Sequence, residues 1–211
     1  MHVETFSVGP LGCNCSIVAD MESRRAVVVD PGGDYARIKA RLDALGVRVD
    51  AIVHTHTHVD HVGCTAELQR ASGATASIHR ADRFLYRILP VQAALVGTSI
   101  PKSAEMDDAL VDGGAVRAGN LEIGVLHTPG HTPGSCSFVV SSRGRTHVLA
   151  GDTLFRGSVG RTDLWGGDHV ALVRSIHSKL LTLPDDAIVV TGHGPSTTIG
   201  EERARNPFLQ R

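Results

Sequence analysis

Neither sign of charge dominates this chain of 211 residues. Its 21 lysine and arginine residues are balanced by 22 aspartate and glutamate residues, so the formal net charge is −1. Proteins that bind nucleic acid by neutralising phosphates carry a surplus of basic residues. We therefore expect no nucleic-acid partner.

Long apolar runs are missing too. The strongest apolar stretches, residues 26–29 and 121–126, have the length of strands, whereas a membrane helix needs about 20 apolar residues. The first residues also lack the basic region and apolar core of a secretory signal peptide. The sequence thus predicts a cytoplasmic protein with no membrane partner, and it leaves the oligomeric state open.

Cysteine is sparse, with four residues. In a reducing cytosol, a chain of this size does not need disulfides to stabilise its core. Cys13 and Cys15 are separated by one residue, whereas zinc knuckles and thioredoxin-type pairs have two residues between the cysteines. We expect free, mostly buried thiols, and we assign Cys13, Asn14, Cys15 and Cys64 to packing.

The apolar pattern alternates between strands and helices. Period-two stretches predict strands at residues 3–8, 15–19, 26–30, 51–55, 121–127, 137–140, 147–150 and 187–191. Helical spacing predicts helices at residues 35–45, 65–72, 81–89 and 169–180, while residues 90–105 are expected to form a loop or lid. Asp34 and Asp168 are the expected caps of the first and last helix, and Val170, Val173, Ile176 and Leu180 the inner face of the last one.

Strands, a helix and a further strand follow one another in each half of the chain. This order predicts the α/β class, as a four-layer αββα sandwich of two sheets with helices outside. No linker rich in proline, glycine or serine separates the halves, so we expect one domain covering residues 1–211.

Histidine is the residue in unusual supply, with 12 copies. Four of them crowd into residues 54–61, HTHTHVDH, after an apolar strand. In extended backbone, residues two apart point to the same face, so His56 and His58 can converge on one ion, while Asp60 and His61 can reach a second. Neutral imidazole and carboxylate suit zinc, iron or manganese. The alternative to a metal site is a solvated polar loop. The density of histidines in this segment disfavours that alternative.

Three further segments have the same form, an apolar strand followed by one metal-capable residue beside glycine or proline. These residues are His131, Asp152 and His193. Strand ends on one edge of a sandwich bring such residues together, and glycine lets the backbone approach a crowded centre. A carboxylate between two ions can bridge them, and we expect Asp152 in that role.

The pattern His-x-His-x-Asp-His at residues 56–61, followed by His131, Asp152 and His193, resembles the metallo-β-lactamase superfamily over most of the chain. The resemblance implies two sets of ligands, which are His56, His58 and His131 for one metal and Asp60, His61 and His193 for the other, with Asp152 between them. It also implies that Asp30, in the turn VDPGG, supports the ligand loop from behind.

Within the superfamily, the stretch 151–163 and the tail motifs at residues 192–197, 202–203 and 206–209 are similar to the glyoxalase II-like, or hydroxyacylglutathione hydrolase-like, enzymes. The similarity implies hydrolysis of a small-molecule thioester such as S-lactoylglutathione. Full-length glyoxalase II has a helical C-terminal domain that helps to bind glutathione, and this sequence ends soon after His193. Its substrate contacts are therefore not carried over, and Arg156 and Arg161 are our candidates, although Arg161 can instead pair with Asp163.

The chemistry expected of a two-metal centre follows from general principles, independently of the resemblance. Two divalent ions about 3.5–4 Å apart lower the pKa of a bridging water, supply hydroxide and polarise the scissile carbonyl. Asp60 is the expected catalytic residue, because it can orient the hydroxide and collect its proton. His127 is a candidate support for the ligands, with a buried structural role as the alternative. Two zinc ions are the expected cofactors, and iron or manganese fits the same donors.

The main alternative activity is that of the persulfide dioxygenases. They share the ligand pattern and the segment GRTD at residues 160–163 but use a single iron, whereas Gly194-Pro195 here is more similar to the hydrolases. A non-catalytic metal-binding module is a second alternative, which the complete ligand set disfavours. A true β-lactamase is disfavoured because zinc enzymes of that kind usually lack a bridging carboxylate such as Asp152. The motifs of serine hydrolases, Walker-type nucleotide enzymes and HExxH metalloproteases are absent.

Overall fold

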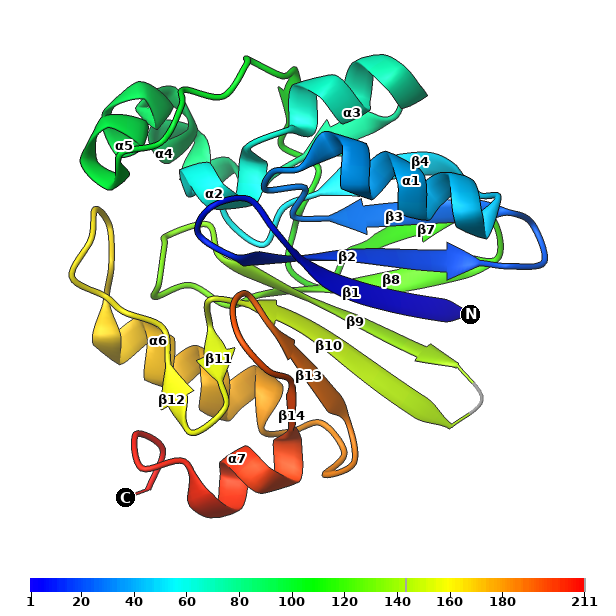
Figure 1. Ribbon diagram of the computed structural model, residues 1–211. Coiled ribbons are helices and arrows are strands. Elements are labelled where there is room, and N and C mark those ends of the chain that lie inside the picture. Colours follow the sequence, from blue (N-terminus) through cyan, green and yellow to red (C-terminus); the bar gives the residue numbers. More distant parts are fainter. Residues whose placement is uncertain (143, 211) are drawn as a thin grey trace.

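Two six-stranded sheets lie at the centre of the protein in this computed structural model, which describes residues 1–142 and 144–210 (Figure 1). The first sheet has the order β1 (His2–Val8), β2 (Cys13–Asp20), β3 (Arg25–Val29), β4 (Arg48–Val53), β5 (Thr75–Ser77) and β6 (Met106–Asp107). The second has the order β14 (Thr197–Thr198), β13 (Ile188–Thr191), β10 (Arg145–Gly151), β9 (Cys136–Ser142), β8 (Leu121–His127) and β7 (Ala115–Ala118). A small hairpin pairs β11 (Leu154–Phe155) with β12 (Ser158–Val159).

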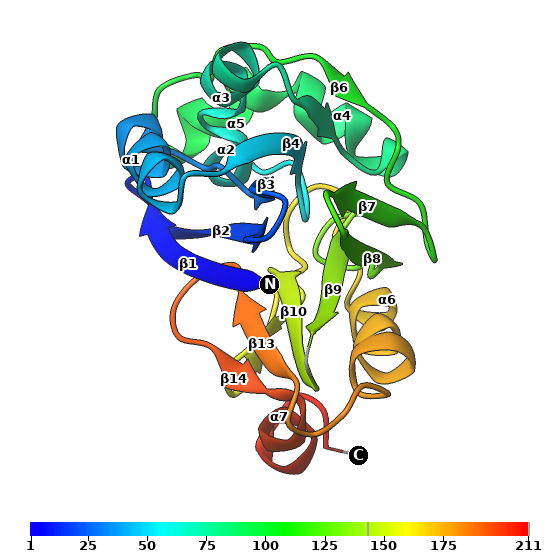
Figure 2. The same ribbon diagram turned by 90° about the vertical axis from the view of Figure 1, so that its right-hand side faces the viewer.

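Helices lie outside both sheets (Figures 1 and 2). On the side of the first sheet are α1 (Tyr35–Leu45), α2 (Val59–Val62), α3 (Thr65–Ser72), η1 (Arg80–Asp82), α4 (Arg83–Arg87) and α5 (Leu89–Val96). On the side of the second are α6 (His169–Ser175), its π-helical continuation η2 (Ile176–Leu180) and α7 (Ile199–Arg205). This arrangement confirms the predicted α/β four-layer sandwich. Within the described residues, no helix has both the length and the apolar character needed to cross a membrane.

The middle layer of the sandwich is apolar. Val27 and Val53 of the first sheet and Phe138 and Leu149 of the second belong to one buried cluster, and each is at most 2% exposed. Burying a side chain of this size contributes about 1.5–3 kcal/mol. The contact between the sheets therefore fixes the position of every loop that leaves their common edge.

Strand direction explains where the polar loops gather. β1, β2 and β3 form an antiparallel meander, and β3, β4, β5 and β6 then run parallel. In the second sheet β10 runs parallel to β13, and β8 has the same direction because both β8 and β10 are antiparallel to β9. The loops that follow β4, β8, β10 and β13 carry the predicted metal ligands.

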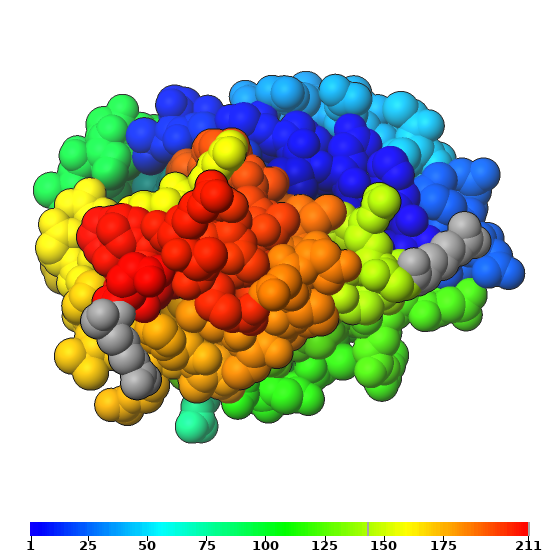
Figure 3. Space-filling model, turned by 90° about the horizontal axis from the view of Figure 1, so that it is seen from below, coloured from blue at the N-terminus to red at the C-terminus, as the bar shows by residue number. Residues whose placement is uncertain are grey.

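The C-terminal tail closes one side of the second sheet. Seen from below, the C-terminal segment, which is red, lies at the surface between yellow and orange segments of the chain (Figure 3). Glu202 accepts a hydrogen bond from the Gly157 amide (2.9 Å), and the Asn206 side chain donates one to the Ser158 carbonyl (2.9 Å). The tail motifs that resemble the glyoxalase II-like enzymes therefore hold the hairpin that follows Asp152.

Several predicted elements are confirmed with their ends, among them residues 35–45, 65–72 and 121–127. Asp34 lies at the start of α1 as expected, but its side chain does not cap the helix. Its backbone is left-handed, with φ +51°, and its carboxylate accepts a hydrogen bond from the Gly9 amide (2.9 Å). Asp168 does cap α6, through the Ala171 amide (3.0 Å).

Three predictions were wrong in part. Residues 90–105 are not all loop, because α5 occupies Leu89–Val96 with Pro90 in its first turn, where proline is tolerated. The inner face of α6 and η2 consists of Leu172, Ile176 and Leu180, whereas Val170 is 66% exposed. The predicted helix at residues 81–89 is divided into η1, α4 and the start of α5.

Candidate metal centre

The loop after β4 delivers three imidazoles to one edge of the sandwich. His56, His58 and His61 are all buried there. His54 belongs to the same segment but is turned away, with Nδ1 3.2 Å from the His61 carbonyl and Nε2 3.3 Å from the Thr65 hydroxyl. Only part of the histidine-rich segment therefore lies at the centre.

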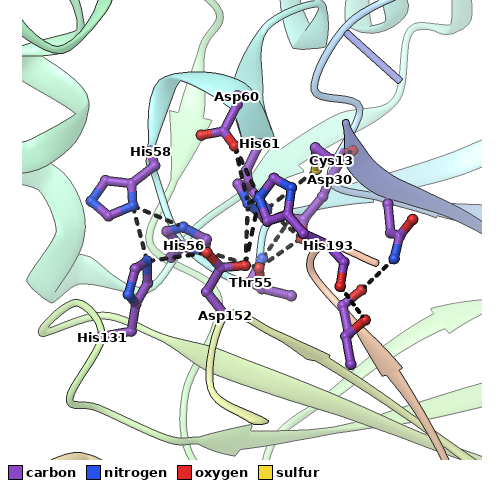
Figure 4. Close-up of polar contacts among 12 residues, drawn as sticks. Cys13, Asp30, Thr55, His56, His58, Asp60, His61, His131, Asp152 and His193 are labelled. Carbon is purple, nitrogen blue, oxygen red and sulfur yellow. Dashed lines mark hydrogen bonds and ion pairs between the residues drawn. The ribbon is translucent and has the colours of Figure 1, made fainter. Parts of the chain in front are cut away.

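His56, His58 and His131 form the first group of converging donors. The Nδ1 atom of His58 lies 3.1 Å from His56 Nε2 and 3.0 Å from His131 Nε2 (Figure 4). All three atoms lie within 4.8 Å of one another, a spacing at which they could hold one metal ion.

Asp60, His61 and His193 form a second group. His193 Nε2 lies 3.1 Å from Asp60 Oδ2 and 3.4 Å from His61 Nε2. His61 comes from α2, while His193 follows β13 in the other sheet. The two sheets thus contribute to one cluster of ligand atoms, as their common edge requires.

Asp152 lies between the two groups (Figure 4). Its Oδ2 is 3.5 Å from His131 Nε2, and its Oδ1 is 3.6 Å from His61 Nε2 and 3.8 Å from His193 Nε2. Oδ1 is buried without a hydrogen-bond partner, which is costly for a polar atom unless a cation satisfies it. This atom, and a donor set of imidazoles and carboxylates, fit divalent zinc, iron or manganese.

In His131 and His193, one ring nitrogen points away from the centre. The hydrogen bond of this outer nitrogen determines which nitrogen faces the centre. The Nδ1 atoms of His131 and His193 lie 2.8 Å and 3.1 Å from the carbonyl oxygens of Arg161 and Leu11. A carbonyl only accepts hydrogen bonds, so both Nδ1 atoms carry hydrogen and both Nε2 atoms present a lone pair. This is how histidine ligands are oriented in metal sites.

Asp30 supports the loop from below. Its carboxylate accepts hydrogen bonds from the amide and hydroxyl of Thr55 (2.7 and 2.6 Å) and lies 3.0 Å from His61 Nδ1. The Thr55 hydroxyl is in turn 3.1 Å from His56 Nδ1. Asp30 itself has φ +52°, a left-handed conformation that costs roughly 1–2 kcal/mol outside glycine. One strained carboxylate thus orients two predicted ligands, and Thr55 is a partner that the sequence did not reveal.

Residues 13 and 14 do more than pack. The Asn14 side chain donates to the carbonyls of Thr191 and Gly194, both at 2.9 Å, so it holds the loop that carries His193. Cys13 Sγ lies 3.5 Å from His61 Nδ1, and burial raises the pKa of this thiol to about 12. The thiols of all four cysteines are free and buried, as expected.

Gly192 is required by the close approach of two loops. A Cβ atom at this position would lie 1.9 Å from Asp152 Oδ1. No side chain can be accommodated at that distance, so any other residue would displace either Asp152 or the backbone that leads to His193.

Asp82 and Gln92 connect the ligand loops and were not predicted. Asp82, which is fully buried, accepts hydrogen bonds from the Thr57 amide (3.1 Å), the Thr132 hydroxyl (2.9 Å) and the Gly134 amide (2.6 Å). Gln92 of α5 accepts one from the Val59 amide (3.0 Å). Since Asp82 lies 25 residues from Thr57 and Gln92 lies 33 residues from Val59, no local spacing could have indicated either contact.

His127 lies beside the loop that carries His131. Its ring stacks on His79, with centroids 3.9 Å apart, and its Nε2 lies 2.9 Å from the Pro133 carbonyl. It therefore touches the loop of His131 and none of the predicted ligand side chains. Arg161 pairs with Asp163 through two contacts of 2.7 Å and is exposed, as is Arg156.

Charge is distributed unevenly over the cluster. Burial, followed by the neighbouring histidines, lowers the pKa of His56 well below its usual value and that of His58 to about 3. Burial acts in the same direction on His61 and His193, but the acidic groups beside them prevail and raise the pKa of both. Metal binding needs the neutral form of each histidine, so at His61 and His193 a metal ion would compete with protons.

Comparison with known proteins agrees with this geometry. The family model of the metallo-beta-lactamase superfamily matches residues 8–193. The chain is 37% identical over 213 residues to the hydroxyacylglutathione hydrolase GloC of Haemophilus influenzae, covering 99% of this chain and 98% of that protein. It is 30% identical over 217 residues to the mitochondrial persulfide dioxygenase ETHE1 of Homo sapiens, covering 95% of this chain and 73% of that protein.

Solved structures show the same similarity. The chain matches the BLEG-1 B3 metallo-beta-lactamase with a TM-score of 0.90 and 35% identity, over the whole of both chains. It matches TTHA1623 in a di-iron-bound form with a TM-score of 0.86 and 38% identity, over 98% of this chain and 100% of that one. The chain therefore belongs to the metallo-beta-lactamase superfamily, and we class it as a metal-binding enzyme of the metallo-hydrolase type.

Proposed function

We propose that this protein is a cytoplasmic thioester hydrolase of the glyoxalase II type, which acts on small-molecule thioesters with two bound divalent metal ions. The main support for the proposal is the position of Asp152, because its two oxygens face two separate groups of donor atoms. GloC, which is named as a hydroxyacylglutathione hydrolase and is similar over nearly its whole length, supports the choice of substrate.

The residues of the two groups would hold the metals as their geometry indicates, with His56, His58 and His131 on one side, Asp60, His61 and His193 on the other, and Asp152 shared. Two such ions supply a nucleophile from water near neutral pH and polarise the scissile carbonyl. Zinc is our first choice, and TTHA1623 is a reason to test iron equally.

Asp60 is the proposed catalytic residue of the chain itself. Its Oδ2 lies beside His193 and His61, at 3.1 and 3.7 Å, and its side chain is 17% exposed. A carboxylate at that place can orient the attacking water and take its proton. His193, 30% exposed, lies on the same open side, whereas the His61 and His131 side chains are at most 2% exposed. Substrate therefore approaches from the side of Asp60 and His193.

The deciding experiment measures thiol release from S-lactoylglutathione after metal-free protein has been loaded with zinc, iron or manganese. We expect hydrolysis that increases up to about two equivalents of metal. His177→Ala, which removes a histidine from outside the cluster, serves as the control and should behave like the wild type. Absence of thiol release with every metal would refute the proposal.

Persulfide dioxygenation is the second candidate, because ETHE1 is 30% identical. The same preparations should be tested for oxygen consumption with glutathione persulfide. One iron per chain with oxygen uptake and no thioester hydrolysis would establish this candidate instead. A β-lactam should be included among the substrates because of the match to BLEG-1.

A further inference from the structure

A pocket lies at the end of the sandwich opposite the candidate metal centre. It has a volume of about 400 Å³ and is formed by the first residues of β1 and by the hairpin of β9 and β10. Figure 2 shows the start of β1, marked N, beside β10. Asp152 follows the far end of β10, whose 7 residues span roughly 23 Å. The pocket therefore shares no residue with the predicted ligand groups.

Polar side chains occupy inward-facing positions of β10 at this pocket. Residues two apart in a strand point to the same face, so Arg145 and His147 share the face of Leu149, which belongs to the apolar cluster between the sheets. Val148 points the other way and belongs to the cluster beneath α6. A strand facing an apolar layer normally places apolar residues at every inward position. Arginine and histidine at two of these positions give this end of the sandwich a polar lining.

Two imidazole nitrogens at the pocket have no hydrogen-bond partner among the described residues. They are His147 Nδ1 and His2 Nε2, and both atoms are buried. His2 Nε2 lies 3.5 Å from Glu4 Oε2, but Glu4 also pairs with Arg41, at 3.2 Å, and does not line the pocket. A buried polar atom without a partner is costly. The two imidazoles therefore indicate a ligand that supplies the missing partners.

The charge of the lining favours an anion. Among the described residues that line the pocket, Arg145, His2 and His147 have side chains that carry positive charge when protonated, and none is aspartate or glutamate. Burial, followed by the charge of Arg145, lowers the pKa of His147. The two side chains thus repel each other when both are charged. An anion bound between them would remove this repulsion.

Phosphate matches this set of donors better than a carboxylate does. One guanidinium can fill both oxygens of a carboxylate by itself, whereas phosphate has further oxygens for the imidazoles and for the Ser142 hydroxyl. The volume also exceeds what a phosphate ion needs. At about 30 Å³ for each water-sized group, the pocket holds roughly a dozen such groups, so a small organic part fits beside the phosphate.

We propose that this pocket is a binding site for a phosphate group carried by a small phosphomonoester, with Arg145, His147, His2 and Ser142 as the donors. The same donors would accept free phosphate, and the test below separates these two sources. The site is distinct from the candidate metal centre, and the inference does not depend on the proposed thioester hydrolysis.

The test is isothermal titration calorimetry on the metal-loaded protein with an untagged N-terminus. Glycerol 3-phosphate, inorganic phosphate and glycerol are compared at constant ionic strength. We expect glycerol 3-phosphate to bind with a Kd below about 1 mM and about threefold or more tightly than inorganic phosphate, and glycerol not to bind. Equal affinities for the two anions would assign the site to free phosphate and overturn the phosphomonoester. Absence of binding by both anions would overturn the site itself.

Two variants separate this pocket from the metal centre, which can itself bind phosphate. Arg145→Gln and His147→Leu should each weaken the binding of glycerol 3-phosphate about tenfold or more, with the metal content of the wild type. Arg87→Gln removes an exposed arginine outside the pocket and should keep the wild-type affinity. An unchanged affinity in both pocket variants would place the ligand elsewhere and overturn the inference.

Melting temperatures give an independent measurement on His147. Without ligand, His147→Leu should melt above the wild type, because leucine removes the unpartnered nitrogen and adds apolar surface beside Leu149. Saturating glycerol 3-phosphate should then raise the melting temperature of the wild type and leave that of the variant unchanged. His169→Leu, at an exposed position, is the control and should respond like the wild type. An equal rise in the wild type and His147→Leu would overturn the inference, as would a variant that melts below the wild type without ligand.

Discussion

The histidines of this protein fall into two groups that differ in one physical property. In the candidate metal centre, each outer ring nitrogen of His61, His131 and His193 is held by a carboxylate or carbonyl, and the other nitrogen points to a shared carboxylate. His79 and His127 are as close to each other as the ligands are, with ring centroids at 3.9 Å, but their rings are stacked and 13° from parallel. The candidate metal centre is therefore distinguished from the stacked pair by ring nitrogens that point to one carboxylate. Short distances between imidazole rings occur in both places.

The largest effect is expected from removing the carboxylate of the metal centre. Asp152→Ala should lose at least one metal ion and more than about a hundredfold in kcat/KM, because the remaining ions would repel each other without the bridge. Metal content and thioester hydrolysis measured on the same sample test this. Asp186→Ala, an exposed aspartate outside the centre, is the control. Full metal content in Asp152→Ala would contradict the bridging role.

A smaller effect is expected from Asp30, which orients ligands without facing the centre. Asp30→Asn should weaken metal binding about 10- to 100-fold, a loss typical for the partners that hold histidine ligands. Asp34→Asn changes the same residue type in the same turn, where the carboxylate accepts a hydrogen bond from the Gly9 amide. Competition with a chelator measures both. Equal affinities in the two variants would show that Asp30 does not support the metal site.

The smallest effect is expected at the stacked pair. Burial, and then the charge of His127, lowers the pKa of His79 to about 4 from 6.5. As the pH falls, His79 is protonated near pH 6.5 in the unfolded chain but only near pH 4 in the folded chain. The free energy of unfolding therefore decreases as the pH falls between these values. His79→Gln should show a weaker decrease of melting temperature from pH 7 to pH 5, with unchanged metal content. A wild-type pH dependence in this variant would contradict the assignment.

Structural features that depend on neighbouring residues could be predicted from the sequence, whereas features that depend on residues remote in the sequence could not. α1, α3 and β8 were predicted with their ends, because periodicity and glycine stops are local. α5 was missed because it is apolar nearly throughout and has no polar face to reveal a period of 3.6 residues. Asp34 has the residue type of a helix cap, but its carboxylate binds the Gly9 amide instead.

In the candidate centre, too, the local pattern was predicted and the contacts between remote residues were not. Its candidate ligands could be predicted because seven donor residues occur beside strand ends in a dense pattern, and the structure brings them together as that pattern indicates. Thr55, Asp82, Gln92 and Asn14 were missed because each contacts a residue remote in sequence, up to 180 positions away for Asn14. Their residue types are common in loops and carry no signal by themselves.

Anomalous X-ray diffraction from crystals of the metal-loaded protein tests the central claim most directly. The account predicts two peaks on either side of Asp152, one among His56, His58 and His131 and one among Asp60, His61 and His193. A single peak held by two histidines and one aspartate would contradict the two-metal centre, as would a peak at His79 and His127 with none beside Asp152.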